Sequence, residues 1–253
     1  MTLTLIVISV DPSIGRVDKS THSQEVLMEL FLEGIADTSK RLFLISKDVH
    51  ASAVLPVQRL RKKGLCGSIS LEWLPFTMDE VDFSQNALSG TINLTELPDS
   101  LHALRLMRNS LCGTVCLEKL PPELIVLDLE ENAFEGTVCL TKLPIPLTDL
   151  SLKRNKLTGT VDLTCLPPVL SNLSISSNQF SGCLDFTNLP WTISSLNLSQ
   201  NRFEGECDFT KLPDSIRYFY FIYIKLSGEV IASPGRMFFG SNSNIVVRWA
   251  HLE

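Results

Sequence analysis

The 253-residue sequence lacks the features of several common protein classes. No apolar run approaches the roughly 20 residues that a membrane-spanning helix needs. The net charge of −6 argues against nucleic acid as the main partner, because nucleic-acid-binding domains usually carry a basic face. No G-x-x-x-x-G-K or G-x-G-x-x-G loop is present for phosphate binding. What remains is the composition of a soluble globular protein, long enough to bury a sizeable core.

Cysteine is present, but not in patterns typical of disulfide frameworks or zinc sites. The seven cysteines are an odd number and none forms a C-x-x-C pair. We therefore expect reduced thiols and a cytoplasmic location. A secreted or cell-surface location stays open, because the apolar residues 1–10 fit a signal segment as well as a first strand. Secretion would also give meaning to the N-x-S/T sequons, which begin at Asn93, Asn172 and Asn197.

A fixed spacing of 23 residues dominates the middle of the chain. Six asparagines follow this period, and a glycine comes four positions after each of them. The asparagines, which we expect to be structural, are Asn86, Asn109, Asn132, Asn155, Asn178 and Asn201. A Leu-Pro pair opens each unit, from Leu74-Pro75 to Leu212-Pro213. Self-similarity at such a period indicates a solenoid of stacked units.

The stretch 127–129, Leu-Asp-Leu, shows how one unit uses its apolar residues. In a strand the two leucines point to one side and Asp128 to the other, and stacked copies build a continuous core. The following Asn132 is expected inside a turn, where its amide bonds backbone groups that the turn leaves unpaired. Gly136 suits a bend that needs positive φ or close backbone approach. A second short strand is predicted after each glycine, as in T-V-C-L.

The full skeleton, L-P-x-x-L-x-x-L-x-L-x-x-N-x-L/F-x-G-x-V/I-x-L, resembles the leucine-rich-repeat family. Seven units cover residues 74–234, and a degraded unit precedes them at 51–73. The tail of each unit is similar to repeats of plant-type receptor ectodomains, and its Leu-Pro opening to repeats of bacterial effectors. The resemblance implies an α/β-type solenoid that is mainly β, an arc with a parallel sheet on its concave side.

The two ends of the chain are predicted to cap this solenoid, since a stack of strands must hide its open edges. Residues 1–50 form the predicted N-terminal cap, with an amphipathic helix at 21–36 and a strand at 41–46. Thr21 with Gln24 fits a capping box. The apolar stripe of the helix consists of Val26, Leu27, Leu30 and Phe31. Residues 235–253 form the predicted C-terminal cap, two strands around a polar turn.

The polar positions between the paired leucines are expected on the outward face of the concave sheet. Charged residues occupy the first units, polar residues the middle units and tyrosines the last. The candidate partner-binding residues are Arg105, Arg108, Asp128, Glu131, Arg154, Ser174, Asn197, Tyr218, Tyr220 and Tyr223. The charges are explained either by cross-strand ion pairs or by a binding role. The tyrosines are either anchors for a partner or a surface that the C-terminal strands cover.

The predicted function is non-catalytic binding of another protein or a peptide through the concave face, without a cofactor. The outward columns hold no histidine or cysteine, so a nucleophile would have no general base there. Asp162, Asp185 and Asp208 occupy one position in three successive units. They are either a solvated row or ligands for a cation such as calcium. The alternative functions are an oligomerising structural protein and a secreted, receptor-like ectodomain.

Overall fold

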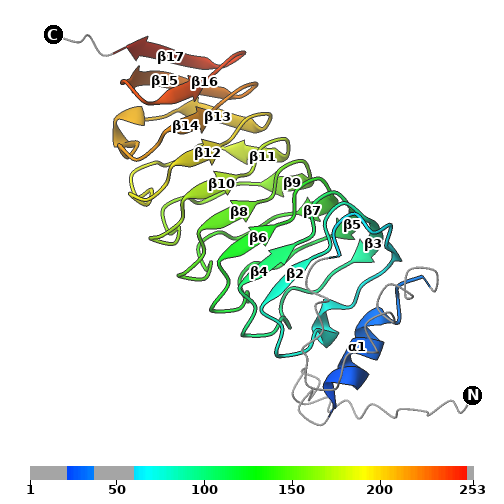
Figure 1. Ribbon diagram of the computed structural model, residues 1–253. Coiled ribbons are helices and arrows are strands. Elements are labelled where there is room, and N and C mark those ends of the chain that lie inside the picture. The colour runs from blue at the N-terminus through cyan, green and yellow to red at the C-terminus, as the bar shows by residue number, and fades with distance from the viewer. Residues whose placement is uncertain (1–21, 37–59, 250–253) are drawn as a thin grey trace, which may run out of the picture.

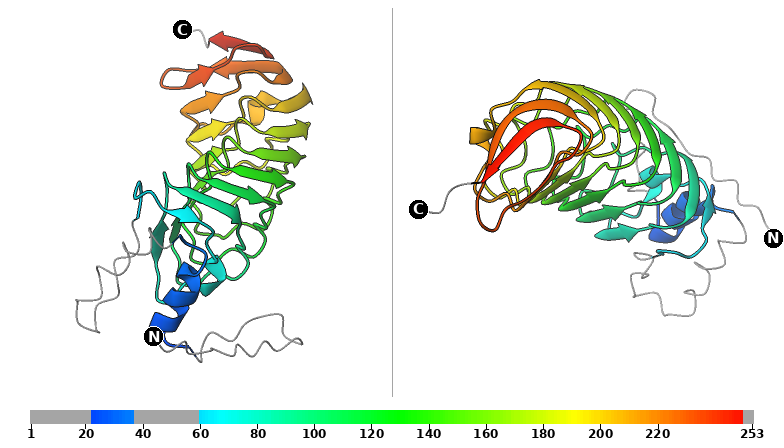
Figure 2. Two further views of the ribbon diagram at one scale, coloured as in Figure 1. Left: turned by 90° about the vertical axis from the view of Figure 1, so that its right-hand side faces the viewer. Right: turned by 90° about the horizontal axis from the view of Figure 1, so that it is seen from above.

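The chain forms one solenoid whose turns stack along a single axis (Figures 1 and 2). The computed structural model describes residues 22–36 and 60–249. Two parallel sheets run the length of the stack, one of eight strands and one of nine. The predicted mainly-β solenoid is thus confirmed. The strands predicted within residues 1–10 and 41–46 lie outside the described residues.

The eight-stranded sheet is built from short strands of three residues. They are β2 (Glu80–Asp82), β4 (Ala103–Arg105), β6 (Val126–Asp128), β8 (Asp149–Ser151), β10 (Asn172–Ser174), β12 (Ser195–Asn197), β14 (Tyr218–Tyr220) and β16 (Met237–Phe239). From β2 to β14 each residue pairs with the residue 23 positions later, as Leu104 pairs with Leu127. The central residue of each strand points into the core, so both end residues face outward.

The nine-stranded sheet lies on the other side of the core. Its strands are β1 (Cys66–Gly67), β3 (Ala87–Thr91), β5 (Ser110–Gly113), β7 (Ala133–Gly136), β9 (Lys156–Gly159), β11 (Gln179–Gly182), β13 (Arg202–Glu206), β15 (Lys225–Ala232) and β17 (Asn244–Trp249). The prediction of a strand after each glycine is wrong, because most of these strands end at the glycine. Gly136 has φ +81°, which turns the chain out of the extended conformation. The following Val138 and Leu140 still reach the core from a loop.

A single apolar core runs between the two sheets. The leucine pairs of every unit contribute to it, together with a phenylalanine series along the stack. Phe180 and Phe203, from successive units, stack with ring centroids 6.3 Å apart and planes 10° from parallel. Each unit buries its apolar side against the next, so no unit has a complete core of its own.

Helix α1 (Gln24–Leu32) packs against the first turns of the solenoid (Figure 1). Phe31 stacks on Phe83 with centroids 5.6 Å apart, and Ile35 bridges to Gly67. The helix is shorter than the predicted 21–36, and its N-cap is Ser23 rather than Thr21. The Ser23 hydroxyl accepts a hydrogen bond from the Val26 amide, 3.4 Å away. Two 3₁₀ turns, η3 (Leu71–Trp73) and η4 (Phe209–Lys211), complete the helical segments of the described residues.

The C-terminal strands β16 and β17 are the two strands predicted around a polar turn. They do not pair with each other: β16 continues the eight-stranded sheet beside β14, and β17 continues the nine-stranded sheet beside β15. The segment therefore forms a further turn of the solenoid. Because β16 lies beside β14 and not across it, the outward face of β14 stays open.

Candidate functional site

The outward face of the eight-stranded sheet carries the residues singled out from the sequence. Arg105, Asp128, Ser174 and Asn197 are the last residues of β4, β6, β10 and β12, and they are half-buried. A second column lies in the turn three residues beyond each strand, where the backbone is left-handed. Its members among the predicted residues are Arg108 (φ +56°), Glu131 (φ +52°), Arg154 (φ +54°) and Tyr223 (φ +53°).

The repeated asparagines hold these turns in place. The Asn155 amide nitrogen donates to the Leu129 and Leu152 carbonyls, both at 3.0 Å, and to the Lys153 carbonyl at 3.3 Å. Its amide oxygen accepts from the Phe134 N–H at 3.1 Å. Two of these partners belong to its own unit and two to the preceding one. Each asparagine thus joins successive turns and aligns the outward columns.

Charged side chains of the first units pair across the strands. Arg108 Nε lies 2.5 Å from one oxygen of Glu131, and Arg154 binds the other oxygen. Lys153 Nζ lies 2.8 Å from a Glu130 oxygen. Hydrogen bonds from Arg154 and Arg108 lower the pKa of Glu131. The arginine side chains are half exposed, so such pairs contribute little stability, but they neutralise much of this region.

Asp128 is the carboxylate of this region that burial perturbs. Burial raises its pKa, and the neighbouring Glu130 and Asp82 carboxylates act in the same direction. A hydrogen bond of 3.0 Å from the Glu130 N–H and the charge of Arg105 act in the opposite direction. The charged form is therefore less stable in the folded chain than in the unfolded chain.

Asp128→Asn is expected to raise the free energy of unfolding at pH 7. The folded-state pKa of Asp128 is raised, so ionised Asp128 destabilises the fold, and this penalty fades as pH falls through that pKa. Asparagine keeps the oxygen that accepts from Glu130 and removes the charge. Urea unfolding at pH 7 and at about pH 4 measures the effect, with exposed Asp99→Asn as the control. A variant less stable than wild type at pH 7 would contradict the expectation.

An aromatic patch occupies the C-terminal end of the same face. It consists of Tyr218, Tyr220, Tyr223, Met237 and Phe239, from β14, β16 and the turn after β14. Tyr223 is 57% exposed and Met237 54%. Tyr220 and Phe239 stack with centroids 4.6 Å apart and planes 7° from parallel. Sequence reasoning found the tyrosines but missed Met237 and Phe239, although M-F-F matches Y-F-Y of the preceding unit in its alternation.

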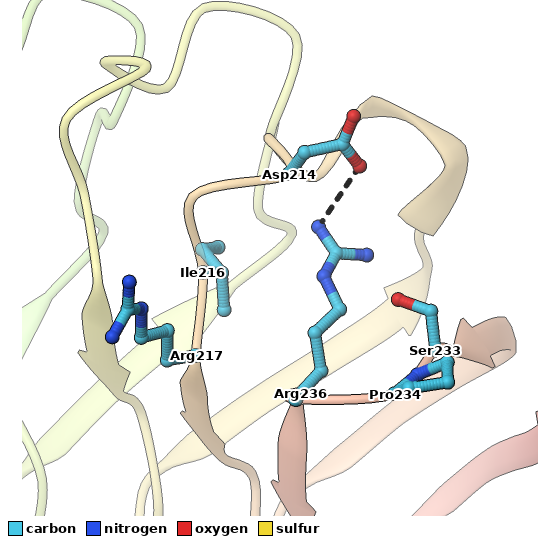
Figure 3. A pocket seen from close by; sticks show the side chains of 7 residues that line it. Asp214, Ile216, Arg217, Ser233, Pro234 and Arg236 are labelled. Atoms are coloured by element: carbon cyan, nitrogen blue, oxygen red, sulfur yellow. Dashed lines mark ion pairs between the residues drawn. The ribbon is translucent and has the colours of Figure 1, made fainter.

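A shallow cavity of about 410 Å³ lies at the start of β14 and β16, beside the aromatic patch (Figure 3). Arg236 forms an ion pair with Asp214 at 3.4 Å and donates to the Pro213 carbonyl at 2.5 Å. Figure 3 shows Arg217 pointing away from this pair. The complete lining is Asp214, Ile216, Arg217, Ser233, Pro234, Gly235 and Arg236. Arg236 thus has partners within the chain, and Arg217 is exposed.

The aspartate row bonds to its own loops. The Asp162 carboxylate accepts from the Thr164 N–H and hydroxyl, at 2.8 and 2.6 Å, and Asp208 accepts the same two bonds from Thr210. Asp185 accepts from the Thr187 N–H at 2.8 Å. These bonds lower the pKa of all three carboxyls. Within residues 22–36 and 60–249, no three His, Cys, Asp or Glu side chains gather as a metal site would require.

All seven cysteines lie in the described part of the chain and carry free thiols. Cys207 is buried in the core, and burial raises the pKa of its thiol. Cys116, Cys165 and Cys183 are exposed. In the same part of the chain, no helix has the length and apolar character needed to cross a bilayer.

Comparison with solved structures identifies the fold. The ectodomain of the plant receptor kinase GASSHO1/SCHENGEN3 from Arabidopsis thaliana, solved with Casparian strip integrity factor 2, superposes with a TM-score of 0.51 at 23% identity. The match covers 70% of this chain and 26% of that one, so this chain spans about a quarter of the ectodomain. No family model matches the sequence, and no curated protein matches it.

Two further structures are more distant. A plant ice-binding protein has a TM-score of 0.44 at 22% identity, over 63% of this chain and 60% of that one. YopM from Yersinia enterocolitica has a TM-score of 0.41 at 25% identity, over 68% of this chain and 44% of that one. The comparisons and the stacked parallel strands together give the leucine-rich-repeat fold.

Proposed function

We propose that this leucine-rich-repeat chain is a non-catalytic module that binds another protein or a peptide. The partner occupies the outward face of the eight-stranded sheet, which the family resemblance makes the concave face. The observation that carries the proposal is the aromatic patch: five large side chains on two neighbouring units, of which four are exposed and Tyr220 is half-buried, although the chain continues past them. Exposed aromatic and methionine side chains on a rigid sheet are typical anchors of protein interfaces.

We expect the charged residues of the first units to contribute less to binding than the aromatic patch does. Glu131 and Glu130 are already paired with basic residues of neighbouring units, so a partner gains little from them. The aromatic patch has no such internal use beyond the stacking of Tyr220 on Phe239. The affinity for a partner is therefore concentrated at the C-terminal end of this face. The ion-paired side chains keep the rest of the face hydrated.

Truncating the aromatic patch is expected to reduce partner affinity at least tenfold, or about 1.4 kcal/mol. The variant is Tyr223→Ala with Met237→Ala, the two most exposed members of the patch. The matched control is Ile231→Ala with Val246→Ala, side chains that are 54% and 53% exposed on the nine-stranded sheet. Partners are captured from native extract on the wild-type chain and identified by crosslinking mass spectrometry. Titration of the identified partner then compares the variants.

Equal affinity for the patch variant and the wild type would reject this location. Equal losses in the patch variant and the control would indicate a general effect on the fold. Loss in the control alone would place the partner on the nine-stranded sheet. Circular dichroism of each variant confirms that the fold is retained before titration.

We infer that the two ends of the solenoid are closed by α1 and by the β16–β17 turn. Phe31 and Leu27 of α1 are fully buried, and the Ala36 and Ser68 amides donate to Cys66 and Gly34 across the junction. At the other end Val247 packs against the core. Both contacts cover apolar side chains of the terminal turns, which is the task of a cap in a repeat protein.

A further inference from the structure

The aromatic patch borders two arginines at the start of its strands. Arg217 directly precedes Tyr218, and Arg236 directly precedes Met237. The Met237 N–H donates to the Arg217 carbonyl at 2.6 Å, so the two arginines lie side by side ahead of β14 and β16. Both line the shallow cavity at these strand starts (Figure 3). The apolar side chains of the patch therefore lie next to a basic edge of the same face.

The two arginines differ in what they contact within the chain. Arg236 pairs with Asp214 at 3.4 Å and donates to the Pro213 carbonyl at 2.5 Å. Its guanidinium carbon lies 5.8 Å from the centre of the Phe238 ring, and its side chain is only 13% exposed. The exposed Arg217 side chain has no ion-pair or hydrogen-bond partner among the described residues. Arg217 is therefore available to a partner, whereas Arg236 is already bound.

Among the described residues, the face beside the patch carries no acidic side chain over the next two strands. β10, β12 and the turns that follow them present uncharged polar side chains: Asn172, Ser174, Ser177, Ser195, Asn197 and Gln200. The nearest acidic residue of this face is Asp149 on β8, three strands from β14 (Figure 1). Its carboxylate accepts a hydrogen bond of 2.6 Å from the Asn172 amide. This part of the face therefore supplies no counter-charge for Arg217.

The acidic residues of the neighbouring loops have bonding partners of their own. Asp214 pairs with Arg236. Hydrogen bonds from Thr210 and the charge of Lys211 lower the pKa of Asp208. The glutamates of β13 and β15 belong to the nine-stranded sheet, on the other side of the core. The described residues thus leave an excess positive charge at the edge of the patch.

A segment that covers the patch also covers part of Arg217. Removing a guanidinium from water costs free energy unless an opposite charge or hydrogen-bond acceptors replace the lost hydration. A carboxylate does both, because its two oxygens match the paired N–H groups of the guanidinium. A basic residue in the same place would be repelled by Arg217 and by Arg236. The edge therefore favours an acidic group beside the apolar contact.

We propose that the partner of the aromatic patch carries an aspartate or glutamate close to its apolar anchor, and that Arg217 binds this carboxylate. The anchor must occupy the patch for this contact to form, so the proposal rests on the proposed function. Uncharged polar residues of the partner lie over β10 and β12. In an extended segment, at about 3.3 Å per residue, the acidic residue falls within about three positions of the anchor.

Selection from a random peptide display library on the full chain tests this chemistry. The wild type is expected to enrich peptides that have an aromatic or aliphatic anchor and an aspartate or glutamate within about three positions of it. Synthetic peptides of the enriched sequences are then titrated. Arg217→Ala is expected to raise the Kd about three- to tenfold, and Arg217→Glu more than about tenfold. Added salt is expected to weaken binding to the wild type more than binding to Arg217→Ala.

The matched control is Lys211→Ala, an exposed basic residue of the same loop that lies near Asp208. Its Kd is expected to equal that of the wild type. A charge exchange tests the contact directly: a peptide with lysine in place of its acidic residue is expected to bind the wild type weakly and Arg217→Glu more tightly. Circular dichroism confirms that each variant retains the fold.

The outcomes separate this proposal from the proposed function. Peptides that lose affinity with Tyr223→Ala and Met237→Ala, but show no acidic preference or bind Arg217→Glu as tightly as the wild type, overturn this proposal alone. Failure to enrich any patch-dependent peptide overturns both proposals. Arg217-dependent binding to phosphatidylserine vesicles, without an acidic preference among the peptides, overturns this proposal and assigns the edge to a membrane surface.

Discussion

Replacing Asn155 by leucine is expected to lower the free energy of unfolding by about 3–5 kcal/mol. The side chain is buried and makes four hydrogen bonds with the backbone of two units. Leucine fits the volume but leaves the Leu129 and Leu152 carbonyls and the Phe134 N–H without this partner, in a place that water does not reach. A loss of this size is a large fraction of the stability of an ordinary domain.

Urea unfolding followed by circular dichroism measures this loss. The control is Asn188→Leu, an exposed asparagine in a loop, for which we expect a change below about 0.5 kcal/mol. Hydrogen exchange locates the effect, with faster exchange expected for the Phe134 amide, which donates to Asn155, than for the Leu157 amide, which donates to Asn178. A decrease in the free energy of unfolding of less than about 1 kcal/mol would show that the repeated asparagines align the turns without contributing much stability.

Gly159→Ala is expected to cost about 2–3 kcal/mol, for two reasons that can be separated. The residue has φ +86°, a conformation that costs an L-amino acid roughly 1–2 kcal/mol. An added Cβ would also lie 2.8 Å from the Thr137 methyl carbon of the preceding unit. At four successive repeat glycines, Gly113, Gly136, Gly159 and Gly182, a threonine of the preceding unit occupies the space that the glycine leaves. These glycines are therefore required for close stacking as well as for the bend.

Gly235→Ala is the matched control for backbone strain. Gly235 has φ +88°, and no atom lies within 4 Å of its added Cβ, so only the conformational cost applies. Thr137→Ser combined with Gly159→Ala removes the methyl group and is expected to recover part of the loss. Equal losses at the two glycines, without recovery in the double variant, would show that the threonine contact contributes nothing.

The repeat could be predicted from the sequence because its physical causes are local. Leu127 and Leu129 alternate with Asp128, and Asn132 follows at a fixed distance, so the strand, its buried side and its turn follow from one unit. The position of the second strand was wrong, because T-V-C-L after Gly136 has the composition of a strand. The left-handed backbone at that glycine ends the strand at Gly136, before T-V-C-L begins.

The candidate site was predictable only in part. Tyr218, Tyr220 and Tyr223 stand in repeat register and were found from it. Met237 and Phe239 were missed, because the segment after residue 234 departs from the repeat spacing and reads as a separate pair of strands. The parallel pairing of β16 with β14 places that segment beside the tyrosines, so it extends their surface and does not cover it.

By itself, the sequence determined the solenoid, its period, its buried columns and the places where polar side chains must meet the backbone. These follow from chain geometry, since a 23-residue unit with one apolar side can bury that side only against its own copies. The tertiary structure decided which exposed residues become neighbours. Tyr218 and Met237 are far apart in the chain but one strand spacing apart in space, so the aromatic patch exists only once the turns are stacked.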